Sequence, residues 1–248
     1  MRCIVGIIKR LLDILLSSVG LLVASPILLP IIVAIWLHDF HSPFYVAPRA
    51  GKNGKPFNMI KLRSMVVNAD KFGIDSTSAL DPRITPIGHF VRRYKLDELS
   101  QLWNVLKGDM SLVGPRPQVP RDVAIYTEKE RELLKVKPGI TDISSIVFAD
   151  EGEILKGSED PDLRYNQIIR PWKSRLGLLY IEHQSIWLDL RLIFLTTLAI
   201  LSKEGALSGV QKVLGSLGAD EKLRRIARRT EELTPSPPPG SNEIVAQR

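Results

Sequence analysis

The chain has 248 residues, of which 44% are hydrophobic and 25% are charged, and this balance excludes a mainly disordered protein. The length suits one substantial core or two small ones. A net charge of +7 favours a negatively charged partner, either a nucleic acid, an anionic membrane surface or a phosphorylated substrate. The single cysteine, Cys3, excludes an intramolecular disulfide and lacks the Cys or His cluster of a structural zinc site.

Residues 14–37 form an uncharged apolar run near the N-terminus. As a straight helix the run would measure about 36 Å, enough to cross a bilayer core of about 30 Å, so a simple transmembrane span is one interpretation. A cleaved secretory signal is another, but the run is longer than the apolar part of typical signal peptides. We therefore expect the segment to persist as a membrane anchor.

Two features favour a re-entrant anchor over a span. Ser25 and Pro26 lie near the middle of the run, and an interior proline removes a backbone hydrogen bond and kinks a helix. Basic residues also flank both ends, and the positive-inside rule then places both ends in the cytoplasm. They are Arg2, Lys9 and Arg10 before the run, and Arg49, Lys52, Lys55, Lys61 and Arg63 after it. We expect residues 1–40 to dip into the membrane as helix, break at Ser25-Pro26 and helix, with Met1 and the globular part facing the cytoplasm.

The segment after the anchor predicts a β-hairpin. Residues 44–46 and 57–60 are extended, apolar pieces on either side of a loop that contains Asn53-Gly54, a strong signal for a tight turn. Lys61 and Arg63 follow two positions apart, so they share one face of a strand, where they can meet phosphate oxygens. A solvated strand edge guarded by charge is the alternative.

Residues 81–117 carry most of the reactive side chains. Thr85 can cap a helix that begins at Pro86. Asp97 and Glu98 then open a second helix, whose apolar spacing predicts a buried face. The residues of that face are Leu99, Leu102, Trp103 and Leu106.

Acidic residues at a helix N-terminus are common because the helix dipole favours them, so the Asp97-Glu98 pair alone does not indicate catalysis. Arginines on both sides of the pair change this interpretation. Arg83 and Arg92 precede it, and Arg116 follows it between two prolines. Guanidinium groups held in this way are what an anionic substrate such as a diphosphate requires.

The run from Lys95 to Pro117, KLDELSQLWNVLKGDMSLVGPRP, resembles the signature of the bacterial sugar transferase family, the monotopic polyprenyl-phosphate phosphoglycosyl transferases. The segment 61–65, KLRSM, is similar to the family's Lys-Phe-Arg-Ser-Met element, with Leu62 in place of the aromatic residue. Ser25-Pro26 matches the family's helix-breaking pair. The resemblance covers about residues 9–201 and implies an α/β, mostly α fold, with a cytosolic catalytic domain over residues 41–202.

The resemblance also implies an activity. Such enzymes transfer a sugar 1-phosphate from a UDP-sugar to a polyprenyl (undecaprenyl) phosphate at the cytosolic face of the bacterial inner membrane, release UMP and so initiate surface glycan synthesis. By this analogy Asp97 is the nucleophile, and Asp97 and Glu98 are neighbours of a Mg²⁺ ion. The residues expected to bind substrate are Lys61, Arg63, Arg83, Arg92 and Arg116.

One segment departs from the commonest pattern of the family. After the turn at 137–140, many members continue with Gly-Trp-Ala-Gln, where this chain has Asp142-Ile-Ser-Ser145. The segment Thr141–Ser145 resembles a subgroup with acetamido donors, so we expect an N-acetylated sugar.

The C-terminal part predicts helices and a tail. Residues 174–201 carry an apolar stripe typical of an amphipathic helix that lies on the bilayer or covers the core. The stripe consists of Trp187, Leu190, Ile193, Phe194, Thr197, Leu198 and Leu201. Residues 203–248 predict a basic helix over 223–229 and a flexible, proline-rich tail over 234–241.

Two functions from other classes remain. A basic nucleic-acid-binding protein would need a recognition motif or an aromatic stacking platform among its cations, and the sequence contains no such set. We therefore expect no nucleic-acid partner. A membrane scaffold without catalysis would not need carboxylates, arginines and a Gly-Pro-Arg-Pro turn within one short stretch.

Overall fold

The structure, a computed structural model, describes residues 2–73, 76–78 and 80–246, so the predicted cytoplasmic position of Met1 concerns a residue outside the described part. The long helices are α1 (Arg2–Asp39), α10 (Arg170–Glu182), α11 (Ile186–Leu201) and α12 (Lys203–Ser216). Shorter helices are α2 (Pro86–Arg93), α3 (Leu96–Leu99), α4 (Leu102–Lys107), α5 (Pro120–Ala124), α6 (Glu128–Arg131), α7 (Ile143–Val147), α8 (Glu151–Ile154), α9 (Pro161–Arg164) and α13 (Glu221–Arg228). Single turns are η1 (Lys52–Gly54), η2 (Ala69–Phe72), η3 (Glu132–Lys135) and the π-helical η4 (Tyr165–Ile169).

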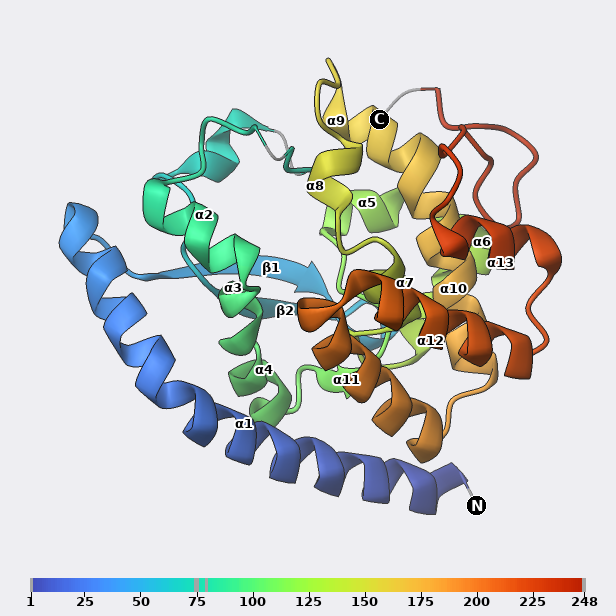
Figure 1. The fold of residues 1–248 in the computed structure, drawn as a ribbon, viewed down its shortest axis with the longest axis horizontal. Coiled ribbons are helices and arrows are strands. Elements are labelled where there is room, and N and C mark those ends of the chain that lie inside the picture. Colours follow the sequence, from blue (N-terminus) through green and yellow to red (C-terminus); the bar gives the residue numbers. More distant parts are fainter. Residues whose placement is uncertain (1, 74–75, 79, 247–248) are drawn as a thin grey trace.

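Four strands complete the described chain: β1 (Phe44–Ala50), β2 (Pro56–Leu62), β3 (Ser111–Val113) and β4 (Gly139–Thr141). The predicted hairpin is confirmed, because β1 pairs antiparallel with β2 and the loop residues Asn53 and Gly54 both adopt positive φ. The short strands β3 and β4 pair in parallel. The mostly helical fold with small sheets agrees with the predicted fold class (Figure 1).

Helix α1 does not stop at Ser25-Pro26 as expected; it is continuous through both prolines and bends along one side of the globular body (Figure 1). The Leu22 carbonyl would normally accept a hydrogen bond from the N–H of residue 26, which proline lacks. The Ser25 hydroxyl donates to that carbonyl instead, at 2.7 Å. The pair therefore bends the helix and satisfies the freed carbonyl without ending the helix.

Both ends of α1 are fixed to the same globular body. Near its start, Lys9 Nζ lies 2.5 Å from the Asp189 carboxylate on α11. Asp13 accepts hydrogen bonds from the backbone N–H of Leu112, at 2.9 Å, and from a serine hydroxyl of β3. At its end, Asp39 forms two hydrogen bonds with Arg63. In length and composition α1 could cross a membrane, and much of its apolar surface is exposed.

The predicted second helix is divided into α3 and α4, and its predicted buried face is wrong at Trp103, which is 53% exposed. Asn104 is the residue that turns inward. Its side chain accepts from the N–H of Ile60 at 2.9 Å and donates to the carbonyl of Asn58 at 2.7 Å. A polar residue is buried here because the backbone of β2 supplies its hydrogen-bond partners.

Helices α7 and α10–α13 surround the largest hydrophobic cluster. The amphipathic segment predicted over 174–201 is two helices, because α10 ends at Glu182 and Ser185 caps α11. Helix α11 turns Leu188, Leu192 and Leu195 into the core. The predicted stripe lies on its outer face except at Ile193 and Leu198, which pack against the core. Trp187 is 82% exposed and Phe194 is 66% exposed.

The region after residue 202 is not an appendage. Helix α12 buries Val210 and Leu214 in the main hydrophobic cluster. The proline-rich segment, expected to be a flexible tail, instead packs against the body, with Arg175 donating to the carbonyl of Pro237 at 2.9 Å. Four prolines restrict the free chain, which lowers the entropy lost when the segment packs.

Candidate active site

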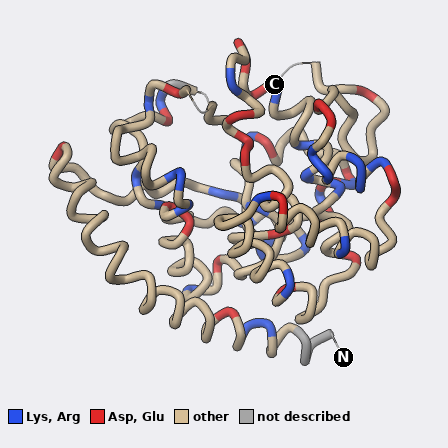
Figure 2. Tube along the Cα trace, in the orientation of Figure 1, with Lys and Arg blue, Asp and Glu red and all other residues tan. Residues whose placement is uncertain are grey.

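A cleft of about 950 Å³ lies between the hairpin, the α2–α3 turn and the segment before α8. All seven residues that the sequence predicted as catalytic or substrate-binding line it: Lys61, Arg63, Arg83, Arg92, Asp97, Glu98 and Arg116. Basic and acidic side chains of distant segments meet there, as Lys61 does with Asp97 and Arg116 with Glu98; Figure 2 shows how positively and negatively charged residues are distributed along the trace. The cleft is therefore the candidate active site.

The two neighbouring carboxylates face different cations. They lie on α3, a single turn that begins after Lys95, whose φ of 56° bends the chain sharply between α2 and α3. The Asp97 carboxylate lies 3.6 Å from Lys61 Nζ, beyond hydrogen-bond distance. The Glu98 carboxylate lies 3.0 Å from Arg116 Nη1. Asp97 is thus the less constrained carboxylate of the two.

Charges in the cleft control the ionisation of Glu98 and Lys61. Burial tends to raise the pKa of Glu98, but the charges of Arg116, Lys95 and Lys61 outweigh burial and lower it. Glu98 in turn raises the pKa of Arg116, so this pair is fully ionised at neutral pH. Burial lowers the pKa of Lys61, against the opposing effect of Asp97.

Arg92 is the cation most available to a ligand. Burial lowers its pKa, and Asp97 and Asp81 act in the opposite direction. Within the described ranges, the Arg92 guanidinium forms no hydrogen bond or ion pair with another residue, although the Arg92 carbonyl accepts from the N–H of Lys95. A partly buried guanidinium in this state is suited to bind a phosphate group.

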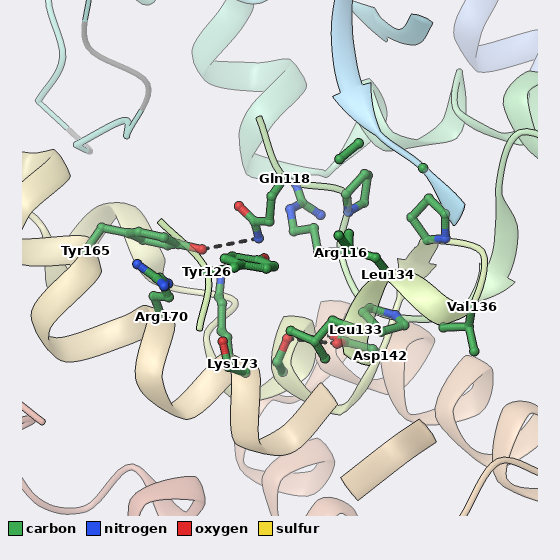
Figure 3. Close-up of a pocket in the computed structure, with 17 residues that line it drawn as sticks. Arg116, Gln118, Tyr126, Leu133, Leu134, Val136, Asp142, Tyr165, Arg170 and Lys173 are labelled. Atoms are coloured by element: carbon green, nitrogen blue, oxygen red, sulfur yellow. Dashed lines mark hydrogen bonds between the residues drawn. The ribbon is translucent and has the colours of Figure 1, made fainter. Parts of the chain in front are cut away.

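Arg116 also lines a second, much smaller cavity. Figure 3 shows Arg116 near Gln118, whose side-chain amide donates a hydrogen bond to the Tyr165 hydroxyl at 3.4 Å. The same residues line this cavity of about 40 Å³, room for little more than one water molecule. The cavity is too small for the nucleotide sugar that the sequence resemblance implies, so the larger cleft is the candidate active site.

Arg63 and Arg83 line the cleft, but their guanidinium groups serve the fold. Arg63 binds the Asp39 carboxylate with both terminal nitrogens, at 2.5 and 2.6 Å, and so ties β2 to the end of α1. Arg83 binds Asp81 at 2.6 Å and the carbonyl of Ala69 at 3.0 Å. The predicted common role of Lys61 and Arg63 at one strand face is therefore not what the structure brings about, since Lys61 faces Asp97 instead.

Several cleft residues had not been predicted from the sequence. Lys173 forms an ion pair with Glu151, and both side chains line the cleft. Thr141 forms hydrogen bonds with the hydroxyls of Ser145, at 3.0 Å, and Thr196, at 2.5 Å. No spacing in the sequence joins Lys173 to Glu151, 22 positions away, or Thr141 to Thr196, 55 positions away, because these pairs meet only through the packing of α10 and α11.

The residues present fit a magnesium ion that is shared with a substrate. Among the described residues, no group of three or more His, Cys, Asp or Glu side chains is placed to enclose a metal. Mg²⁺ at phosphate-transfer sites is usually held by one or two carboxylates together with phosphate oxygens. Asp97 and Glu98, next to each other on the cleft wall, offer that set of donors.

Comparisons with known proteins identify the family of the chain. A family model described as bacterial sugar transferase matches residues 4–203. The chain is 34% identical over 215 residues to a sugar transferase of Haemophilus influenzae, covering 81% of this chain and 42% of the relative. It is 38% identical over 195 residues to an undecaprenyl-phosphate glucose phosphotransferase of Komagataeibacter xylinus, covering 76% of this chain and 35% of the relative.

A further relative, from Bacillus subtilis, is named as a candidate undecaprenyl-phosphate N-acetylgalactosaminyl 1-phosphate transferase. It is 45% identical over 134 residues, which cover 54% of this chain and 71% of the relative. The chain spans less than half the length of the Haemophilus and Komagataeibacter proteins. Because the family model matches most of the chain, the protein belongs to the bacterial sugar transferase family.

Proposed function

We propose that this protein transfers a sugar 1-phosphate from a UDP-sugar to a polyprenyl phosphate and releases UMP. The observation that carries the proposal is the pair Asp97 and Glu98 on the wall of a large cleft, within reach of Lys61, Arg92 and Arg116. A carboxylate surrounded by cations can attack a diphosphate whose own negative charge the cations neutralise. The names of the relatives, which include transferases to undecaprenyl phosphate, support this substrate class.

The reaction has two steps, and both occur at one phosphorus atom. First, a carboxylate oxygen of Asp97 attacks the phosphorus that bears the sugar, the bond from that phosphorus to UMP breaks, and an aspartyl-phosphosugar forms. Second, a phosphate oxygen of the lipid attacks the same phosphorus and releases the Asp97 carboxylate. Division into two steps lets a soluble donor and a membrane-bound acceptor use the site in turn.

The contacts of the two carboxylates support Asp97 as the nucleophile. Glu98 is held by a short ion pair with Arg116, whereas the Asp97 carboxylate has no hydrogen bond from any described residue. Its lone pairs are therefore available for attack. Glu98 fixes the Arg116 guanidinium, which then faces the donor's phosphates with Arg92.

Asp97 and Glu98 would also hold Mg²⁺, which supplies neutralisation of the diphosphate charge when it is bound. The remaining neutralisation falls to the chain's own cations. Arg92 binds an equatorial phosphate oxygen, and Lys61, whose Nζ lies 3.6 Å from the Asp97 carboxylate, adds a positive charge beside the reacting phosphorus. Removal of divalent ions by chelation should reduce turnover and leave the fold intact.

We further propose that α1 is a re-entrant anchor at the cytosolic face of the bacterial inner membrane. Lys9 and Asp13 near its start and Asp39 at its end are all bound to one polar body, and a straight span would separate them by the bilayer. Single-cysteine variants near both ends should resist a membrane-impermeant thiol reagent in intact cells. Labelling of the N-terminal position from outside the cell would restore the span.

We also propose an acetamido sugar in the donor. Of the segment Thr141–Ser145, Thr141 and Ser145 line the cleft, and their hydroxyls, 3.0 Å apart, are polar groups of the kind that can bind an amide. Asp142 caps α7 instead of facing a ligand. A panel of UDP-sugars decides this, and turnover of UDP-glucose or UDP-galactose without turnover of any N-acetylated donor would refute it.

The central test combines UMP release with trapping of the intermediate. Membranes that contain the protein are incubated with UDP-sugars and polyprenyl phosphate, and quenched protein is mapped by mass spectrometry. We expect released UMP and a phosphosugar on Asp97, and neither in Asp97→Asn. Absence of UMP with every donor would leave the scaffold or nucleic-acid functions, and an adduct on Glu98 would reverse the two roles.

A further inference from the structure

The wall of the cleft opposite α3 is formed by residues 148–152, just before and within α8. Phe148, Ala149, Glu151 and Gly152 line the cleft, and Asp150 lies between them with its side chain turned away. Lys95, two positions before Asp97, reaches across to the carbonyl of Ala149 at 3.5 Å. The position of this wall therefore fixes how wide the site is beside the reacting carboxylates.

Two cations from the C-terminal helices hold the wall from behind. The Asp150 carboxylate lies 2.7 Å from Lys203 Nζ, at the start of α12, and 3.2 Å from Arg229 Nη2, at the end of α13. The Arg229 guanidinium also lies over the ring of Phe148, 5.4 Å from its centroid. These contacts lower the pKa of Asp150 in spite of its burial.

Local geometry indicates that Asp150 and Arg229 do not stabilise the ends of the helices that carry them. Asp150 stands at the first position before α8, yet its carboxylate does not cap that helix. Arg229 ends α13 with φ of 58°, a conformation that glycine adopts at lower cost. An arginine in this place bears strain while its side chain reaches the cleft wall, and only 11% of that side chain is exposed.

We propose that Asp150, Lys203 and Arg229 position the cleft wall 148–152 and so set the affinity of the site for the nucleotide-sugar donor. The proposal rests on the proposed function. The family model ends at residue 203, so Arg229 and the helix that carries it come from the part of the chain beyond that match. The C-terminal helices would thus contribute to the site from behind, without touching the substrate.

The wall acts on the donor through Glu151, which pairs with Lys173 in the cleft and whose charge is felt by Arg116 and Arg92. When the ion pairs of Asp150 with Lys203 and Arg229 are lost, the wall is no longer held in place, and the donor must order it on binding. That cost applies equally to the ground state and the transition state, so KM should rise while kcat changes little.

The test uses Arg229→Gly, Arg229→Lys and Asp150→Asn in the full chain, with UDP-sugar varied at saturating polyprenyl phosphate. We expect KM for the donor to rise about three- to tenfold in Arg229→Gly and Asp150→Asn, with kcat within about twofold, and Arg229→Lys to restore most of the affinity. Arg225→Ala removes an exposed arginine of the same helix, whose one ion pair among the described residues is with Glu231 at 3.5 Å, and should behave as the unmodified protein.

A purely structural role of Arg229 predicts that KM changes only in variants that also lose stability. Glycine relieves the backbone strain at position 229 and so offsets part of the stability lost with the ion pair; the Arg229→Gly protein should therefore remain folded at the assay temperature while its KM rises. Hydrogen exchange of residues 148–152 gives a readout independent of turnover and should speed up in Arg229→Gly but not in Arg229→Lys. Unchanged KM and exchange would overturn the positioning role. Absence of UMP from the unmodified protein would instead refute the proposed function. The hydrogen-exchange result would still decide whether Arg229 and Asp150 hold the wall in place.

Discussion

Replacement of Glu98 by glutamine tests the division of work between the two carboxylates. The Glu98 oxygen lies 3.0 Å from Arg116 Nη1, and 18% and 29% of the two side chains are exposed. Breaking a fully buried pair costs about 3–5 kcal/mol, and an exposed pair contributes at most about 1 kcal/mol. The partial exposure places Glu98→Gln between these limits, at about 1–2 kcal/mol of lost stability, or a melting temperature lower by about 2–8 °C.

The activity of Glu98→Gln should fall much further than its stability. Arg116 would no longer be fixed by a carboxylate, and loss of one positioned charge at a transferring phosphate costs about 10²–10³ in kcat. Asp97 would still react, so we expect the phosphosugar adduct to form slowly in this variant. The assays are thermal unfolding in detergent micelles, UMP release and mass spectrometry of quenched protein.

A matched control and the pH dependence complete this test. Glu153→Gln removes an exposed carboxylate of α8 that pairs with Lys156, and it should alter stability by less than about 0.5 kcal/mol. The folded pKa of Glu98 is lowered, so the stability from its pair is present above the unfolded pKa and is lost as pH falls through the folded one. The gap between the two proteins should therefore be constant near pH 7 and close below about pH 4.5. Wild-type activity in Glu98→Gln, or loss of its adduct with full stability, would refute the assigned role.

Three further predictions follow from the cleft and its supports. Arg63→Ala should leave KM for the donor within about twofold and expose the end of α1 to protease, because the Arg63 guanidinium binds Asp39. A large rise in KM would show that Arg63 binds the substrate. Gly139→Ala places a Cβ 2.1 Å from the backbone nitrogen of Gly114 and should cost about 3 kcal/mol, measured by urea unfolding; an unchanged midpoint would contradict this packing. Burial raises the pKa of Asp142, so the folded state binds the proton of this carboxyl more tightly than the unfolded state does. Asp142→Asn should therefore be as stable as the unmodified protein below pH 3.8, and more stable as pH rises from there through the raised pKa of the folded protein. The opposite trend would show that the buried Asp142 charge does not destabilise the fold.

Local rules gave the sequence its most reliable predictions. The Asn53-Gly54 turn, the cap at Thr85 and the two carboxylates on a first helical turn all depend on residues close together in the chain, and the structure has each of them. The long, uncharged run likewise required an apolar helix wherever it packs. Backbone geometry and charge near a helix end act over a few residues, so a sequence contains all the information they need.

Only tertiary structure decided what each charge binds. Arg63 and Arg116 look alike in sequence, yet one is bound by a carboxylate at the end of α1 and the other by the Glu98 carboxylate in the cleft. The same holds for Arg229, whose partner Asp150 lies 79 positions away. Long cationic side chains take whichever carboxylate the packed helices bring within a few ångströms, and the packing of nonadjacent segments, not the order of residues, sets those distances.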